Sequence, residues 1–237
     1  MKAVVLAGGK GTRLAPYTQI LPKPLMPIGD MPILEVLIKQ MMLHGFTDII
    51  LTVGHLSHLL QSYFQDGSRY GVRIHYSHEE QPLGTAGPLS LIEGLEETFL
   101  VTNGDVLTAL DLSELIEFHR KKGACATIAM HEREVKIDLG VIRLNGGMEV
   151  EGYIEKPSMD YRVSMGVYVF EPEVLNYIPK AKYLDFPDLV HKLLEAGERV
   201  MGFPYDGYWQ DLGRPDDYQQ AWEDFESLKP VILGKAA

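Results

Sequence analysis

Three glycines and two cations stand together near the amino terminus. Residues 6–14 read LAGGKGTRL and overlap the end of a short apolar run, KAVVLA, over residues 2–7. Glycines at such a place let backbone N–H groups approach a phosphate chain, and Lys10 and Arg13 can neutralise its charge. Two familiar phosphate loops do not fit, because G-x-G-x-x-G would need a glycine where Leu14 stands and the Walker pattern is absent. We therefore expect a phosphate-binding loop of a different kind.

The charge of the chain is distributed unevenly. The 237 residues contain 22 Lys and Arg against 33 Asp and Glu, a formal net charge of −11. Residues 1–29 nevertheless contain four cations and no acid. A cationic, glycine-rich segment in an acidic protein indicates that an anionic ligand binds at that one place. The acidic remainder argues against a general surface for nucleic acid or anionic membrane.

Five further motifs follow the glycine-rich loop. They are LPKPLMPIGDMPIL over residues 21–34, EQPLGTAG over 80–87, NGD over 103–105, EKP over 155–157 and WQDLG over 209–213. In this order they resemble the nucleotidyltransferases that make nucleotide sugars from a nucleoside triphosphate and a sugar 1-phosphate. The resemblance extends over essentially the whole catalytic domain of that family. It implies an enzyme with these two substrates.

The resemblance assigns one set of residues to the nucleotide. They are Leu6, Gly8, Gly9, Gly11, Thr12, Arg13, Gln81, Gly84 and Asp105. It also implies that Asp105 and Asp211 hold Mg²⁺ as the cofactor. Mg²⁺ prefers hard oxygen ligands, and one or two protein carboxylates with phosphate oxygens and water often suffice. The alternative for each aspartate is a turn-capping role.

The resemblance assigns a second set to the sugar phosphate, namely Lys23, Gly140, Glu155 and Lys156. The expected catalytic residues are Arg13, Lys23, Asp105 and Asp211. A phosphate dianion is already a nucleophile, so attack on the α-phosphorus requires mainly orientation and charge neutralisation. Glu155 and Lys156 are adjacent, and neighbours on a strand face opposite sides. Only a bend at Pro157 would let both reach one pocket, and a surface ion pair is the alternative.

The segment at residues 84–87 bears on the nucleobase and the sugar. The sequence GTAG at residues 84–87 resembles guanylyl- and some thymidylyl-type enzymes more than uridylyl or cytidylyl ones. It favours GTP and a mannose- or heptose-1-phosphate guanylyltransferase. The alternatives are a glucose-1-phosphate thymidylyltransferase or other sugar nucleotidyltransferase, and a non-catalytic nucleotide-sugar-binding regulator on the same fold. A sugar-transferring enzyme is disfavoured because the chain contains no Asp-x-Asp.

The elements that must position these residues alternate along the first half of the chain. Apolar runs at residues 2–7, 48–53, 72–77 and 98–102 predict strands, and helical patterns lie between and after them near 33–42, 56–64, 84–95 and 112–122. This alternation predicts an α/β fold with a doubly wound, mostly parallel, Rossmann-like mixed sheet. Gly8, Gly54 and Asp105 follow strand ends, where such sheets bind ligands. Asp30 and Asp111 are the expected caps of the helices that follow them.

After Gly123 the pattern changes to successive strands. They are expected at residues 124–131, 140–144, 150–154, 164–170 and 200–208, with a helix around Leu189 and a final helix from Pro215 that buries Tyr218, Trp222 and Phe225. We expect one catalytic domain over 1–237, with a nucleotide-binding half at 1–123. The second half, 124–237, would hold the sugar phosphate on a small β-rich subregion and supply the closing helices. We expect no additional C-terminal domain.

Composition sets the remaining limits. Hydrophobic residues make up 46% of the chain and charged residues 23%, as in ordinary globular proteins. The absence of an apolar run near 18 residues argues against a transmembrane helix. The single cysteine, Cys125, cannot form an internal disulfide, which favours a cytoplasmic protein. We expect the nucleoside triphosphate and the sugar 1-phosphate as partners, with no nucleic acid and no membrane, and a homo-oligomer is compatible with the sequence.

Overall fold

The computed structural model describes residues 1–234 and contains a central seven-stranded sheet. Its order is β12 (Val200–Pro204), β8 (Ala126–Lys136), β11 (Ser158–Phe170), β6 (Phe99–Asn103), β1 (Lys2–Leu6), β4 (Asp48–Val53) and β5 (Arg73–His78). The strand β11 is antiparallel to both of its neighbours, and the other adjacent pairs are parallel. The predicted mostly parallel mixed sheet is therefore confirmed.

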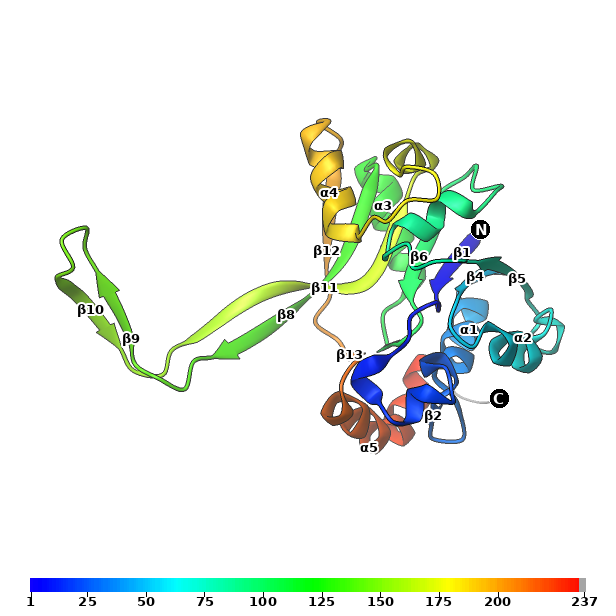
Figure 1. Ribbon diagram of the computed structural model, residues 1–237, viewed down its shortest axis with the longest axis horizontal. Helices are drawn as coiled ribbons and strands as arrows, with labels where there is room; N and C mark the ends of the chain where they lie inside the picture. The colour runs from blue at the N-terminus through cyan, green and yellow to red at the C-terminus, as the bar shows by residue number, and fades with distance from the viewer. Residues whose placement is uncertain (235–237) are drawn as a thin grey trace.

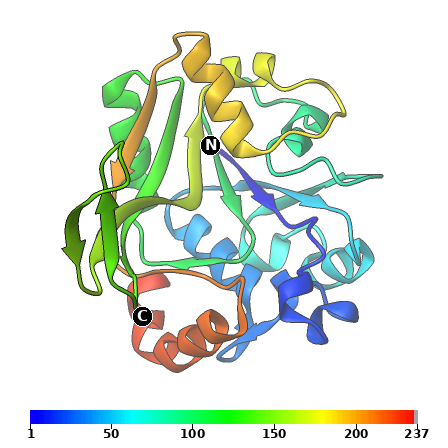
Figure 2. The same cartoon turned by 60° about the vertical axis from the view of Figure 1, so that its left-hand side comes forward.

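Helices cover both faces of this sheet (Figures 1 and 2). On one face, α1 (Ile33–Leu43), α2 (Ser57–Phe64) and α3 (Leu112–Lys122) contribute to one core cluster. On the other face, α4 (Phe186–Glu195) contributes to a second cluster. Consecutive residues of β1 alternate between the two clusters, so this strand is buried on both sides, as its unbroken apolar sequence predicts.

A third core cluster lies beside the glycine-rich loop and forms around α5 (Pro215–Ile232). It includes residues of the short elements η1 (Thr12–Leu14), β2 (Pro27–Ile28), β3 (Met31–Pro32) and β7 (Val106–Thr108). The strand β7 pairs with β13 (Trp209–Asp211). The other short helical turns are η2 (Tyr17–Gln19), η3 (Lys23–Leu25), η4 (Ser68–Tyr70), η5 (Gly87–Leu91) and η6 (Pro172–Tyr177).

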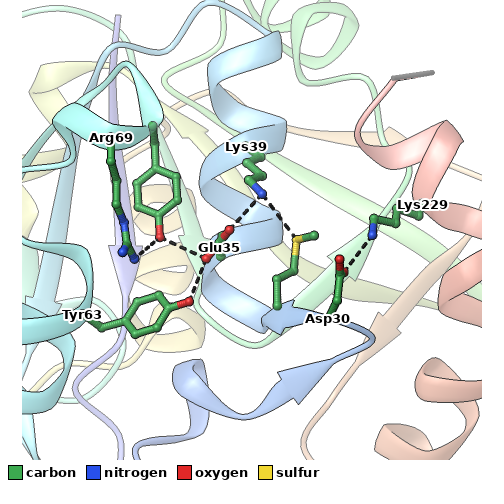
Figure 3. Close-up of polar contacts among 8 residues, drawn as sticks. Asp30, Glu35, Lys39, Tyr63, Arg69 and Lys229 are labelled. Carbon is green, nitrogen blue, oxygen red and sulfur yellow. Dashed lines mark hydrogen bonds and ion pairs between the residues drawn. The ribbon is translucent and has the colours of Figure 1, made fainter. Parts of the chain in front are cut away.

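Polar side chains tie the first helices to one another (Figure 3). The Glu35 carboxylate on α1 accepts hydrogen bonds from the hydroxyls of Tyr63 and Tyr70, at 2.9 and 3.0 Å. It also pairs with Lys39 at 2.8 Å. Because Tyr63 belongs to α2 and Tyr70 to η4, this one carboxylate fixes three elements on the same face of the sheet.

Some local predictions are confirmed and others are wrong. Asp111 caps α3, since its carboxylate accepts from the backbone N–H of Ser113 and Glu114. Asp30 does not cap α1, because its carboxylate pairs with Lys229 at 2.7 Å instead (Figure 3). Trp222 is exposed rather than buried.

The predicted helix at residues 84–95 is also wrong. Only the short turn η5 forms there, because the N–H groups of Ala86 and Gly87 donate to the Leu184 carbonyl instead of building a helix. None of the helices in residues 1–234 is both long and apolar enough to cross a membrane.

The strands β8 and β11 are longer than the predicted runs and carry a projecting arm, defined here as residues 131–163. Beyond the sheet these two strands pair only with each other. At the far end, β9 (Val141–Leu144) and β10 (Val150–Ile154) form a separate hairpin. Figure 1 shows this arm extending away from the rest of the molecule. No arm residue is buried.

Candidate active site

A pocket of about 940 Å³ lies at the carboxyl ends of β1, β4 and β6. Parallel strands bring these ends to the same edge of the sheet, where ligands of such folds bind. The lining comes from the glycine-rich loop, the turns after these strands and a segment from Glu79 to Pro88. All nine residues predicted to bind the nucleotide lie here: Leu6, Gly8, Gly9, Gly11, Thr12, Arg13, Gln81, Gly84 and Asp105.

The loop after β1 has a left-handed backbone at Gly11, where a side chain would be strained. Gly11 has φ of 60°, and a Cβ there would lie 3.0 Å from Thr18 Cγ2 and 3.2 Å from Lys23 Cβ. The Thr18 hydroxyl donates to the Gly11 carbonyl at 2.8 Å, which fixes this turn. Gly9, by contrast, has no atom within 4 Å of where a Cβ would stand. The loop is thus rigid at Gly11 and open at Gly9, so that a phosphate can approach the backbone.

Four charged residues predicted to be catalytic lie beside this loop. Lys23, only 6% exposed, forms an ion pair with Asp105. The pairing of β13 with β7 places Asp211 opposite Val106, next to Asp105. Arg13 reaches the same point, because a Cβ on Gly213 would lie 3.0 Å from both Arg13 Nη2 and Asp211 Oδ1.

The two aspartates differ in their electrostatic surroundings. Burial raises the pKa of Asp211, and the nearby Asp105 carboxylate raises this pKa further. Lys23 and Arg13 act in the opposite direction but do not cancel these effects. Asp105 is compensated directly by its ion pair with Lys23. The site therefore contains one paired carboxylate and one carboxylate that lacks a full counter-charge, which fits a cation-binding site.

The segment after β5 forms another wall of the pocket. Gly84 has φ of 79°, and a Cβ there would lie 2.6 Å from the Leu184 carbonyl oxygen. The Glu79 carboxylate accepts a hydrogen bond from the Leu83 N–H at 3.1 Å, and burial raises its pKa. Sequence reasoning did not select Glu79 or Tyr183, which also line the pocket. Tyr183 comes from a distant loop, and no local sequence signal points to it.

Of the predicted sugar-phosphate residues, only Lys23 lines this pocket. Gly140, Glu155 and Lys156 lie on the arm, where the Tyr153 hydroxyl donates to the Glu155 carboxylate at 3.1 Å. A Cβ on Gly140 would overlap the Tyr153 hydroxyl, so these residues form a local group of their own. Lys156 has φ of 44°, which marks a sharp bend before Pro157. The structure thus separates the predicted residues into a pocket group and an arm group.

Comparisons with known proteins identify the family of this chain. A family model described as nucleotidyl transferase matches residues 2–227. This chain belongs to the nucleotidyl transferase family. The family resemblance seen in the sequence is therefore confirmed, and the glycine-rich loop and the aspartates all lie inside the matched region.

Individual nucleotidyl transferase relatives carry different substrate names. The chain is 39% identical to a UTP–glucose-1-phosphate uridylyltransferase of Synechocystis, over 93% of this chain and 62% of that protein. It is 34% identical to a mannose-1-phosphate guanylyltransferase of Mycobacterium tuberculosis, over 94% and 64%. The chain thus spans just under two thirds of the length of these relatives. The solved structure of HddC from Yersinia pseudotuberculosis has a TM-score of 0.73 and 26% identity, covering 94% of this chain and 99% of HddC.

Proposed function

We propose that this protein transfers a nucleotidyl group from a nucleoside triphosphate to a sugar 1-phosphate and releases pyrophosphate. The observation that carries the proposal is the convergence of Arg13, Lys23, Asp105 and Asp211 beside the glycine-rich loop. Two anionic substrates repel each other, so a site that joins them needs several fixed cations and a metal-binding group. Family membership supports the same reaction.

The glycine-rich loop would hold the triphosphate. Its open backbone at Gly9 and its fixed turn at Gly11 present N–H groups to phosphate oxygens. Arg13 is exposed beside this loop and can neutralise the outer phosphates. Lys23 is held at the edge of the loop by its ion pair with Asp105, where it can face the phosphate that is attacked.

Asp105 and Asp211 fit a Mg²⁺ site. Their carboxylates are neighbours, and Asp211 lacks a full counter-charge. Bound Mg²⁺ would supply charge neutralisation at the triphosphate. Within residues 1–234, no group of three or more His, Cys, Asp or Glu is arranged so that it could hold a metal ion. The remaining ligands of an ion held by these two aspartates would be phosphate oxygens and water, as Mg²⁺ sites commonly have.

We propose GTP as the nucleotide and mannose or heptose 1-phosphate as the acceptor. The residues at 84–87 support this choice, and so do the guanylyltransferase relatives. HddC has been solved in complex with GMP-PN, and its structure resembles this chain with a TM-score of 0.72 at 25% identity. The uridylyltransferase relative supports an alternative substrate pair, UTP and glucose 1-phosphate. We also propose a cytoplasmic protein, because its single cysteine forms no internal disulfide.

The sugar-phosphate role of Gly140, Glu155 and Lys156 remains part of this proposal. It requires that the arm group meet a pocket group, because a phosphate acceptor must lie next to the triphosphate for in-line attack. The division into a nucleotide half at 1–123 and a sugar-phosphate half at 124–237 is proposed on the same ground.

Pyrophosphate release measured with four nucleoside triphosphates and a panel of sugar 1-phosphates tests the reaction. We expect Mg²⁺-dependent turnover with the highest kcat/KM for GTP and mannose or heptose 1-phosphate. The matched negative control is the Asp211→Asn variant. An absence of turnover with every pair, together with tight nucleotide-sugar binding, would refute the transferase and favour the non-catalytic regulator. Turnover with UTP alone would keep the reaction class and exclude GTP as substrate.

A further inference from the structure

Trp209 begins the strand that carries Asp211, and the proposed reaction gives this tryptophan no role. The strand β13 has only three residues and forms a two-stranded sheet with β7, apart from the seven-stranded sheet. Side chains two residues apart on a strand point to the same side, so Trp209 and Asp211 share one side of β13. Whatever holds Trp209 in place therefore also influences where the Asp211 carboxylate lies.

The Trp209 indole is bonded to the seven-stranded sheet at an irregular point of β11. Its N–H donates to the Met165 carbonyl at 2.9 Å. The register between β11 and β8 shifts between Ser164 and Tyr168, which marks a β-bulge around Met165. A bulge disrupts the strand ladder, and because Met165 is buried, its carbonyl needs a donor from elsewhere. The indole N–H is such a donor, and it ties β13 to the central sheet.

The same bulge contacts the segment that carries Asp105. Gly166 has φ of 73°, and a Cβ there would lie 2.6 Å from Asn103 Nδ2 and 3.4 Å from Val106 Cγ2. Asp105 lies between these two residues in the chain. The bulge of β11 therefore contacts both segments that carry the aspartates, one through close packing at Gly166 and the other through the indole hydrogen bond.

Further contacts hold the indole and its strand. The indole packs against the core cluster shared by α1, α2 and α3, and its ring lies 5.4 Å from the ring of His131. The His131 ring is itself fixed, because its Nδ1–H donates to the Tyr205 carbonyl at 2.9 Å. The next side chain of β13, Gln210, donates to the Asp217 carboxylate of α5 at 2.7 Å. The strand is thus tied to the central sheet by its tryptophan and to α5 by its glutamine.

We infer that Trp209 is a positioning residue of the cation site, and that its hydrogen bond to the Met165 carbonyl holds the Asp211 carboxylate next to Asp105. The inference rests on the proposed function, because it takes both aspartates as ligands of Mg²⁺. This ion demands near-ideal octahedral geometry, so a displaced carboxylate binds it more weakly. Loss of a group that orients a metal ligand lowers metal affinity about 10–100-fold. Trp209 acts through the backbone of a short strand, so we expect the lower end of this range.

Removing the donor while keeping an aromatic ring tests this role. The Trp209→Phe variant keeps a ring beside His131 and loses the indole N–H. Its matched control is Trp222→Phe, because Trp222 is the other of the two tryptophans and is exposed on α5. Electron paramagnetic resonance of free Mn²⁺, added alone, follows binding at the cation site without any substrate. We expect the Mn²⁺ dissociation constant to rise about tenfold in Trp209→Phe and to stay at the wild-type value in Trp222→Phe.

The Trp222→Phe protein supplies a second measurement, which needs no change at Trp209. Trp209 is its one remaining tryptophan, so the tryptophan fluorescence reports on the hydrogen-bonded indole alone. Coupling between two sites is reciprocal, so a cation that fixes Asp211 must also act on the hydrogen bond that positions it. We expect the Trp209 emission to change as Mg²⁺ fills the site, with the occupancy measured from the displacement of Mn²⁺. Unchanged emission at full occupancy would overturn the inference, whether or not Trp209→Phe folds.

The Asp211→Asn variant separates a failure of this inference from a failure of the proposed function. We expect it to bind Mn²⁺ more weakly than the wild type. If it does, and a Trp209→Phe variant that is folded by circular dichroism binds Mn²⁺ as tightly as the wild type, the positioning role alone is overturned. If Asp211→Asn binds Mn²⁺ as the wild type does, Asp211 is not a ligand, and the proposed cation site is refuted together with the inference.

Kinetics distinguish a positioning role from a general loss of structure. In Trp209→Phe we expect half-maximal pyrophosphate release at an Mg²⁺ concentration about tenfold higher than in the wild type, and the wild-type kcat at saturating Mg²⁺. A loss of kcat that Mg²⁺ does not restore would overturn the positioning role. An absence of wild-type turnover with every substrate pair, together with the expected Mn²⁺ binding, would instead refute the proposed function alone.

Discussion

Replacing Asp211 by asparagine in the metal-free protein should stabilise the fold while it removes turnover. The Asp211 carboxylate is partly buried beside Asp105, and its pKa is raised. A raised pKa means that the folded state disfavours the ionised form of this acid. An asparagine removes the cost of burying a charge at this position and the repulsion between this charge and the Asp105 carboxylate. It also keeps an oxygen in the position of Asp211 Oδ1. We expect the free energy of unfolding to increase by about 0.5 kcal/mol, the size of an interaction between partly exposed charges.

The Asp105→Asn variant is the matched control, because its stability should change in the opposite direction. Asp105 pairs with Lys23, whose side chain is almost fully buried. Removing the carboxylate leaves this ammonium without its counter-charge and should cost about 1–3 kcal/mol. Both variants should lower kcat by roughly 10²–10³, since a neutral amide is a poor ligand for Mg²⁺ and the loss matches that of one transition-state contact.

Denaturant unfolding in the presence of a chelator, and pyrophosphate release at saturating Mg²⁺, measure the two effects. The stabilisation by Asp211→Asn should be present at neutral pH and disappear below about pH 4, where the carboxylate is protonated in the unfolded chain as well. If Asp211→Asn destabilises the metal-free protein, the electrostatic reasoning is refuted. If either variant keeps full turnover, that residue does not belong to the metal site.

Three further predictions test other parts of the molecule. Gly11→Ala should cost about 1–2 kcal/mol of stability and raise the KM for the nucleotide, because the φ of Gly11 is left-handed. Gly9 has open space around it, so Gly9→Ala should leave the unfolding midpoint unchanged. Equal losses of stability in both variants would contradict the loop geometry. Lys156→Ala should raise the KM for the sugar phosphate more than that for the nucleotide, and a nucleotide-selective defect in steady-state kinetics would reverse the assignment. Burial lowers the pKa of His119, so the free energy of unfolding should fall as pH drops below about 6.5. Unfolding curves of the His119→Gln variant should lack the loss of stability that protonation of His119 causes. Identical pH profiles for the variant and the wild type would exclude His119 as the cause of that loss.

The sequence by itself determined the elements whose signals are local. The β-branched run after Met1 predicted β1, and the Asp111 cap with the Gly123 stop predicted α3 within its observed bounds. The glycine-rich loop was identifiable because a left-handed backbone, as at Gly11, favours glycine whatever surrounds it. The predicted helix at 84–95 failed because a distant carbonyl, that of Leu184, accepts the N–H groups that a helix would have used.

Only the tertiary structure decided which distant residues meet. Asp105 and Asp211 are neighbours because β13 pairs with β7, and hydrogen bonds between such separated strands leave no periodic signal in the sequence. No local sequence signal shows that Tyr183 lines the pocket or that Lys229 forms an ion pair with Asp30 either. The pattern after Gly123 predicted successive strands, but a strand pattern does not state what packs against either face of a strand. The course of β8 and β11 beyond the sheet left apolar side chains of the arm exposed, among them Val135 and Met159.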